Sequence, residues 1–115
     1  MSYMLLIVEP QGQRRERSAQ ELRHAYQRML EFAEQLQRAR QLVATNSLRE
    51  DAVRVRLSGG KPVVLDGPFT EAREMIGGFF LLSCQTRAEA LAIAGRCPAA
   101  EWATVEVREL GPCYE

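Results

Sequence analysis

Two short segments of this chain are apolar at every position, and they constrain the fold more than any other feature. Positions 4–8 read Met-Leu-Leu-Ile-Val, and positions 79–82 read Phe-Phe-Leu-Leu. A strand with water on one face alternates between apolar and polar residues, so these segments are predicted to be strands that are covered on both faces. Any fold for this chain must therefore supply two covering layers.

The first covering layer is predicted to be a pair of helices. Positions 18–21 (Ser-Ala-Gln-Glu) and 86–89 (Thr-Arg-Ala-Glu) are capping boxes, which mark helix starts. From Ser18 to about Arg40, apolar residues recur every three or four positions, which predicts a long amphipathic helix. A shorter helix is predicted from Thr86 to about Arg96, and Pro98 marks its end.

The remaining segments predict further strands. A short strand at 42–44 leads into a bend at 45–47, and 104–108 alternates as a final strand. Between them, 53–57 alternates as a half-buried strand, 58–61 forms a turn and 62–65 returns as its partner. One helical turn is predicted at 70–75. This order predicts a single α+β domain over 1–115, ferredoxin-like, with an added β-hairpin.

The second covering layer is predicted to come from another copy of the chain. Both crossover helices of this topology fall on one face of the sheet, so the other face of the two apolar strands stays bare. A second identical sheet would cover it in a twofold homodimer. The alternative is cover by the hairpin or by the C-terminal tail of the same chain.

Composition excludes several functional classes. Fifteen basic residues balance fifteen acidic ones, which argues against a nucleic-acid-binding protein. No apolar stretch reaches the roughly 18 residues of a membrane span, and no secretory signal is visible, so a soluble cytoplasmic protein is expected. An odd number of cysteines and a single histidine predict neither disulfides nor a metal site. Without a phosphate loop or dinucleotide fingerprint, no cofactor is expected.

The candidate site is the block Asp66-Gly67-Pro68-Phe69, which follows the predicted return strand. Asp66 can place a carboxylate at the lip of a pocket, with Phe69 as a wall; alternatively it is a turn residue whose side chain caps nearby amides. Gly67 and Pro68 set the backbone under either interpretation. Two arginines on one face of the preceding strand could bind an anionic ligand nearby, or could be solvated charges: Arg54 and Arg56.

These blocks resemble the YCII-related family and, within it, the DGPF subgroup. The matching residues are Tyr3 to Ile7, Asp66 to Phe69 with Glu71 and Glu74, Ile76-Gly77-Gly78-Phe79-Phe80, and Val105 to Arg108. The resemblance implies a ferredoxin-like fold that forms dimeric α+β barrels. Most of the family has no established activity. One branch carries out a dehydrochlorination, and DGPF members are often encoded beside extracytoplasmic-function sigma factors, which implies a possible sigma-factor association.

Relatives in the wider family are thought to use a histidine–aspartate pair for acid–base chemistry. Their histidine lies on the first helix, at the position of Met29 in this chain. The only histidine here is His24, five residues earlier and therefore about 140° away around a helix. The pair that the resemblance implies is thus incomplete.

Two functional hypotheses remain open. In the first, the protein is a dimeric small-ligand-binding or regulatory protein with a pocket near Asp66, Gly67, Pro68 and Phe69. In the second, it is a small metal-independent acid–base enzyme that eliminates or isomerises a small metabolite, with Asp66 as the base. The missing histidine weakens the second, because one carboxylate must then supply both proton-transfer roles. Neither the ligand nor the reaction can be derived from the sequence.

Overall fold

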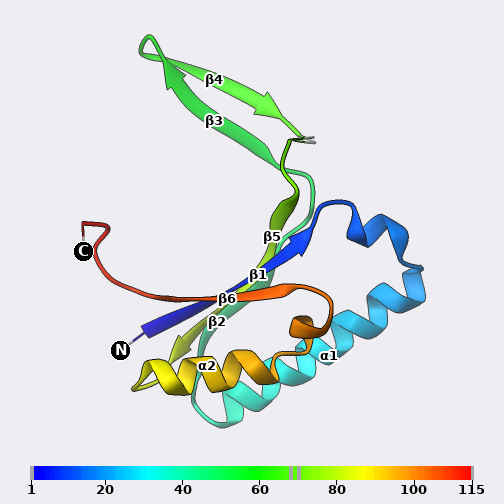
Figure 1. The fold of residues 1–115 in the computed structure, drawn as a ribbon, viewed down its shortest axis with the longest axis vertical. Coiled ribbons are helices and arrows are strands. Elements are labelled where there is room, and N and C mark those ends of the chain that lie inside the picture. The colour runs from blue at the N-terminus through cyan, green and yellow to red at the C-terminus, as the bar shows by residue number, and fades with distance from the viewer. Residues whose placement is uncertain (1, 68, 70, 115) are drawn as a thin grey trace.

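A computed structural model describes residues 2–67, 69 and 71–114. Pro68 of the candidate site lies outside these residues. The chain forms strands β1 (Ser2–Pro10), β2 (Leu42–Ser47), β3 (Val53–Ser58), β4 (Lys61–Asp66), β5 (Glu74–Ser83) and β6 (Thr104–Glu109). Its α-helices are α1 (Ala19–Arg38) and α2 (Arg87–Arg96), and two short 3-10 helices are η1 (Gln13–Glu16) and η2 (Pro98–Glu101) (Figure 1).

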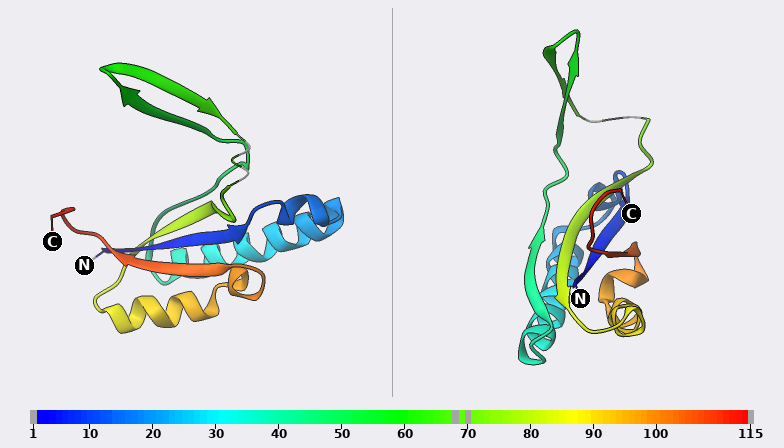
Figure 2. Two further views of the ribbon diagram at one scale, coloured as in Figure 1. Left: turned by 45° about the horizontal axis from the view of Figure 1, so that its top comes forward. Right: turned by 90° about the vertical axis from the view of Figure 1, so that its left-hand side faces the viewer.

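The body of the molecule is one antiparallel sheet in the order β2-β5-β1-β6. The two segments that are apolar throughout are its central strands, with Leu5 opposite Phe80 in their register. Both helices lie on the same side of this sheet (Figure 2). The predicted α+β ferredoxin-like fold with an added hairpin is confirmed.

Alternate residues of the central strands face the helices and form the core. Leu5 and Leu82 are completely buried, and Leu36 of α1 and Ile93 of α2 pack into the same cluster. Phe32 of α1 meets Phe80 edge-to-face, with 5.3 Å between the ring centroids. Burying these side chains is the main source of stability, at roughly 1.5–3 kcal/mol each.

The opposite side of the sheet is apolar and only partly covered. We call it the open sheet face, and it consists of Met4, Leu6, Val8, Ile76, Phe79 and Leu81. These residues pair across β1 and β5, with Met4 opposite Leu81, Leu6 opposite Phe79 and Val8 opposite Ile76. Ile76 is 48% exposed. Within the described residues, no other element of the single chain forms the predicted second covering layer over this face.

The hairpin of β3 and β4 departs from the prediction. It forms a separate two-stranded sheet that projects away from the body (Figures 1 and 2). Every residue of β3 is exposed, so the prediction of a half-buried strand is wrong for the single chain. The physical reason is that neither strand packs to any extent on another described helix or strand. Gly59 and Gly60 adopt positive φ at the turn, as a tight hairpin requires.

Two segment boundaries also differ from the predictions. No helical turn forms in the described part of 70–75, because Glu74 and Met75 already belong to β5, where they pair with Pro10 and Glu9 of the long strand β1. The predicted bend at 45–47 is instead the second half of β2, which pairs with β5 as far as Gly78. Both errors come from tertiary pairing that extends strands beyond their apolar segments.

The helix starts follow the predicted caps. The Ser18 hydroxyl accepts from the Glu21 amide, and the Glu21 carboxylate accepts from the Ser18 amide, so the first capping box is complete. At α2 the Thr86 hydroxyl accepts from the Glu89 amide, while the Glu89 carboxylate takes the Gln85 amide instead. Neither helix, nor any other in the described ranges, is long and apolar enough to cross a membrane.

The three cysteines have different surroundings, which gives a first testable prediction. Cys84 and Cys97 are buried, and burial raises the pKa of both thiols, whereas Cys113 is exposed. Because thiolates react and thiols do not, a thiol reagent at neutral pH should modify one cysteine rapidly in the folded protein and all three after denaturation. Cys113→Ser should remove the fast phase. A fast phase that survives in this variant would contradict the buried positions of the other two.

Candidate functional site

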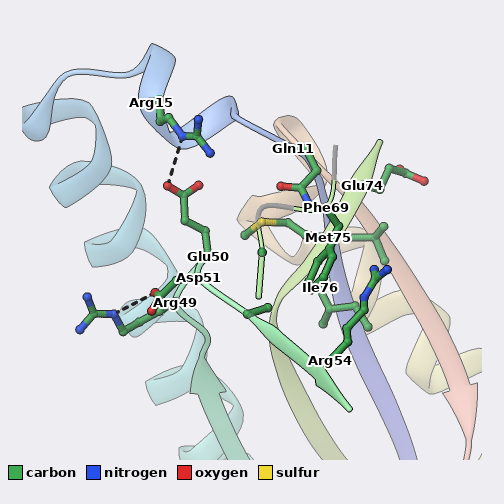
Figure 3. A pocket seen from close by; sticks show the side chains of 13 residues that line it. Gln11, Arg15, Arg49, Glu50, Asp51, Arg54, Phe69, Glu74, Met75 and Ile76 are labelled. Atoms are coloured by element: carbon green, nitrogen blue, oxygen red, sulfur yellow. Dashed lines mark ion pairs between the residues drawn. The ribbon is translucent and has the colours of Figure 1, made fainter. Parts of the chain in front are cut away.

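A cavity of about 570 Å³ lies where the hairpin joins the body, and we call it the hinge cavity (Figure 3). Its volume falls within the range of small-molecule sites, roughly 300–1,000 Å³. It is lined by Val8, Gln11, Arg15, Arg49, Glu50, Asp51, Ala52, Arg54, Gly67, Phe69, Glu74, Met75 and Ile76.

One wall of the hinge cavity is an arginine stacked on an aromatic ring. The guanidinium carbon of Arg54 lies 3.9 Å from the centroid of the Phe69 ring. This cation–π contact positions the arginine and leaves the edge of its guanidinium group able to donate hydrogen bonds. The apolar part of the wall is supplied by Val8, Met75 and Ile76.

Gly67 fixes the backbone beside this wall. Its amide donates to the Ala52 carbonyl at 2.9 Å, which ties the end of β4 to the residue before β3. A Cβ at this position would lie 2.9 Å from the same carbonyl oxygen and 3.4 Å from the Phe69 ring. Glycine is therefore required for the close approach that holds Phe69 against the cavity.

The polar part of the cavity carries charges of both signs. Arg15 Nε lies 3.5 Å from Glu50 Oε1, and Arg49 Nε lies 3.4 Å from Asp51 Oδ1 (Figure 3). The second oxygen of Glu50, Oε2, is buried and has no hydrogen-bond partner among the described residues. A buried acceptor without a donor is costly, so this oxygen is suited to a donor supplied by a ligand or by water.

The predicted site residues divide between the cavity and the surface. Arg54, Gly67 and Phe69 line the hinge cavity. Asp66 and Arg56 are exposed and are not among the lining residues. Their predicted roles are untested by this placement, and Pro68 is outside the described residues.

Sequence reasoning missed Arg15 and Glu50, which come from two polar connections 35 positions apart in the chain. No local motif marks either residue. Only the fold brings the two connections together, beside the start of the hairpin.

A second cavity, of about 710 Å³, lies between α1 and the sheet, and we call it the helix cavity. Met29, the position at which the family resemblance implies a histidine, is one of its lining residues. His24 is exposed and is not. His24 therefore does not supply, in this cavity, the imidazole that the family resemblance implies. The thioether of Met29 occupies that position instead.

A partly buried ion pair is part of the lining of the helix cavity. Arg14 Nε donates to Glu9 Oε1 at 2.6 Å, and the Glu9 side chain is only 8% exposed. Arg14 also donates to the carbonyls of Leu48 at 2.8 Å and Gly77 at 3.3 Å. These bonds use the guanidinium group to join β1, the segment after β2, and β5. We call this arrangement the Glu9–Arg14 clamp, and its contacts are those of a structural element.

Metal ligation finds no support in the described parts of the chain. No three His, Cys, Asp or Glu side chains there gather in an arrangement that could hold an ion.

Comparison with known proteins places the fold and the family. The chain is 44% identical over 43 residues to an uncharacterized protein of Rhizobium meliloti (strain 1021), a match that spans 37% of this chain and about a third (35%) of that protein. The structure of the present chain is similar to that of the 5-chloro-2-hydroxyhydroquinone dehydrochlorinase of Burkholderia phenoliruptrix AC1100 in complex with 2,5-dihydroxybenzoquinone. The TM-score is 0.57 at 13% identity, with 96% of this chain and 94% of that chain covered, which shows a shared fold. A sequence model of the YCII-related domain matches residues 1–113. The chain therefore belongs to the YCII-related family.

Proposed function

We propose that this protein is a dimeric small-ligand-binding protein whose ligand occupies the hinge cavity. The observation that carries the proposal is the unpaired, buried Glu50 Oε2 in the same cavity as the Arg54 guanidinium group and the Phe69 ring. A few converging polar groups within an apolar wall are typical of small-molecule sites. The expected ligand is a small molecule with an apolar or aromatic body, a donor for Glu50 and an acidic or carbonyl group for Arg54.

A ligand screen by thermal shift tests this site. A compound that binds only the folded protein stabilises it by about 2.7 kcal/mol when present at 100 times its Kd. Arg54→Ala should abolish the stabilisation by any hit from the screen. Arg56→Ala is the matched control, because Arg56 lies two positions along the same exposed strand but outside the cavity. Equal loss in both variants, or in neither, would contradict binding in the hinge cavity.

The dimer is proposed to form through the open sheet face. Strand β6 places Arg108 opposite Met4 and Glu106 opposite Leu6, so an apolar centre is flanked by charges of both signs. Under a twofold axis such an edge is complementary to itself. Light scattering should give twice the 13.0 kDa mass of one chain. A regulatory role with a sigma factor, which the family resemblance implies, would be supported if the factor co-purified with this dimer.

The second candidate function is an acid–base enzyme that uses Asp66. Its support is the position of Asp66 at the end of β4, directly before the cavity residue Gly67. The dehydrochlorinase named above removes chloride from a ring compound, and an elimination of that kind is the reaction class proposed here. Asp66→Asn should abolish turnover of any substrate that is found while leaving the melting temperature unchanged. Full activity in this variant would leave the enzyme hypothesis without a base.

A further inference from the structure

The charged side chains that line the hinge cavity balance one another. They are three arginines and three carboxylates: Arg15, Arg49, Arg54, Glu50, Asp51 and Glu74. Four of them form ion pairs within the lining, Arg15 with Glu50 and Arg49 with Asp51. Such a lining disfavours a ligand with a net charge, because a charge transferred from water needs an opposite charge beside it. The ligand is therefore expected to be neutral or to carry charges of both signs.

Glu50 provides an acceptor on one side of the cavity. Its Oε2 is buried and has no hydrogen-bond partner among the described residues. Its Oε1 lies 3.5 Å from Arg15 Nε, beyond the roughly 2.7–2.9 Å of a charge-assisted hydrogen bond. The side chain is 31% exposed, so rotation about its last bond presents the carboxylate to a ligand. An ammonium group, which combines a positive charge with several N–H donors, matches this acceptor.

Arg54 provides a cation on the other side of the cavity. Phe69 holds its guanidinium group, with 3.9 Å between the guanidinium carbon and the ring centroid. No carboxylate in the described ranges forms an ion pair with Arg54, whereas the other two arginines of the lining are both paired. The planar guanidinium group binds a carboxylate through two parallel hydrogen bonds. Arg54 is thus the cation that remains for an acidic group of the ligand.

An apolar wall separates these two charged groups. Figure 3 shows Glu50 and Arg54 on different sides of the cavity, with the side chains of Met75 and Phe69 between them in that view. Ile76 adds to the same apolar lining. A ligand that reaches both ends must therefore hold its own two charges apart. A methylene or aromatic spacer suits this wall better than a peptide group, whose N–H and C=O would lose water without gaining partners.

We propose that the hinge cavity binds an ω-amino carboxylate, a molecule with an ammonium group at one end and a carboxylate at the other. This rests on the proposed function and names the chemical class of its ligand. The ammonium group pairs with Glu50, the carboxylate pairs with Arg54, and the spacer lies along the apolar wall. An α-amino acid has the same two charges but carries both on one carbon, so it satisfies only one end of the cavity.

Two isomers supply the first test. The compounds ε-aminohexanoate and norleucine have the same atoms and the same net charge, and they differ only in the position of the ammonium group. In isothermal titration calorimetry with the wild-type protein, ε-aminohexanoate should bind at least about tenfold more tightly than norleucine, hexanoate or hexylamine. The physical reason is that each of the other three compounds leaves one charged group of the cavity without a partner.

Two matched variants test the role of Glu50. Glu50→Gln removes the negative charge and keeps the shape, so the affinity for ε-aminohexanoate should fall about tenfold or more. The same variant should bind hexanoate at least as well as the wild-type protein does. Glu16→Gln is the control, because it changes the net charge equally at an exposed residue of η1 that does not line the cavity. This variant should bind ε-aminohexanoate within about twofold of the wild-type affinity.

The outcomes separate the ligand class from the site. No measurable binding of ε-aminohexanoate, equal affinity for norleucine, or equal loss in the two glutamine variants overturns the ω-amino carboxylate proposal. If hits from the thermal-shift screen still lose their effect in Arg54→Ala and keep it in Arg56→Ala, the hinge cavity remains the binding site and only the ligand class is wrong. If those hits stabilise Arg54→Ala as well as the wild-type protein, both proposals are overturned.

Discussion

Arg14→Leu is expected to lower the free energy of unfolding by about 3 kcal/mol, because it leaves the Glu9 carboxylate buried without its partner. Glu9 is the only charged residue among the buried side chains in the described part of the chain. The Arg14 side chain is 28% exposed, so the expected loss is at the lower end of the range for fully buried pairs. Denaturant unfolding measures it directly.

The next residue along the chain is a matched control. Arg15 also forms an ion pair, with Glu50 at 3.5 Å, but its side chain is 67% exposed. Arg15→Leu should change the free energy of unfolding by less than about 1 kcal/mol, as exposed pairs do. Similar losses in the two variants would show that burial of the clamp does not matter, which would contradict the structural role assigned to it.

Substitution of Gly77 is a second test of the Glu9–Arg14 clamp. It is the extra residue of a bulge in β5, since Ile7 pairs with Gly78 while Val8 pairs with Ile76. A Cβ on Gly77 would overlap Glu9 Oε2 and lie 2.7 Å from Arg14 Nη2. Gly77→Ala should therefore destabilise the protein by displacing the ion pair. In the Arg14→Leu background the same substitution should cost less, and equal costs in both backgrounds would show that the bulge and the clamp are independent.

The body of the fold could be predicted because its signals are local. The two segments without alternation became the central strands, and the capping boxes start both helices as expected. The placement of both helices on one side of the sheet followed from the handedness of the crossovers. The bare second face was also predictable, because helices on one side leave apolar residues such as Leu6 and Phe79 on the other.

The site was predictable only in part, since it depends on contacts between distant segments. Arg54, near the start of β3, and Phe69, shortly after the end of β4, lie at the cavity because both are at the base of the hairpin. The pairing of Arg15 with Glu50 has no trace in the local sequence. Glu9 did leave a signal. It continues the phase of buried residues Tyr3, Leu5 and Ile7, so a charged residue at that position indicates a buried partner. The prediction of a half-buried strand was wrong because alternation identifies an apolar face without showing that the rest of the chain packs on it.

Two adjacent leucines of β5 separate the stability of one subunit from that of the proposed dimer. Leu82 is completely buried against the helices, and Leu82→Ala should lower the free energy of unfolding by about 3–4 kcal/mol at any protein concentration. Leu81 lies on the open sheet face opposite Met4 and is only partly covered.

Leu81→Ala should therefore leave the unfolding of a dilute sample nearly unchanged and weaken the dimer, which lowers the melting temperature only where the wild-type protein is dimeric. Unfolding curves at concentrations below and above the dimer dissociation constant distinguish the two effects. The same chemical change is made at both positions, so the loss of methylene groups is matched and only the covering layer differs. A concentration-independent loss for Leu81→Ala as large as that for Leu82→Ala would mean that the single chain already covers both faces of its sheet, and the argument for a second copy would fail.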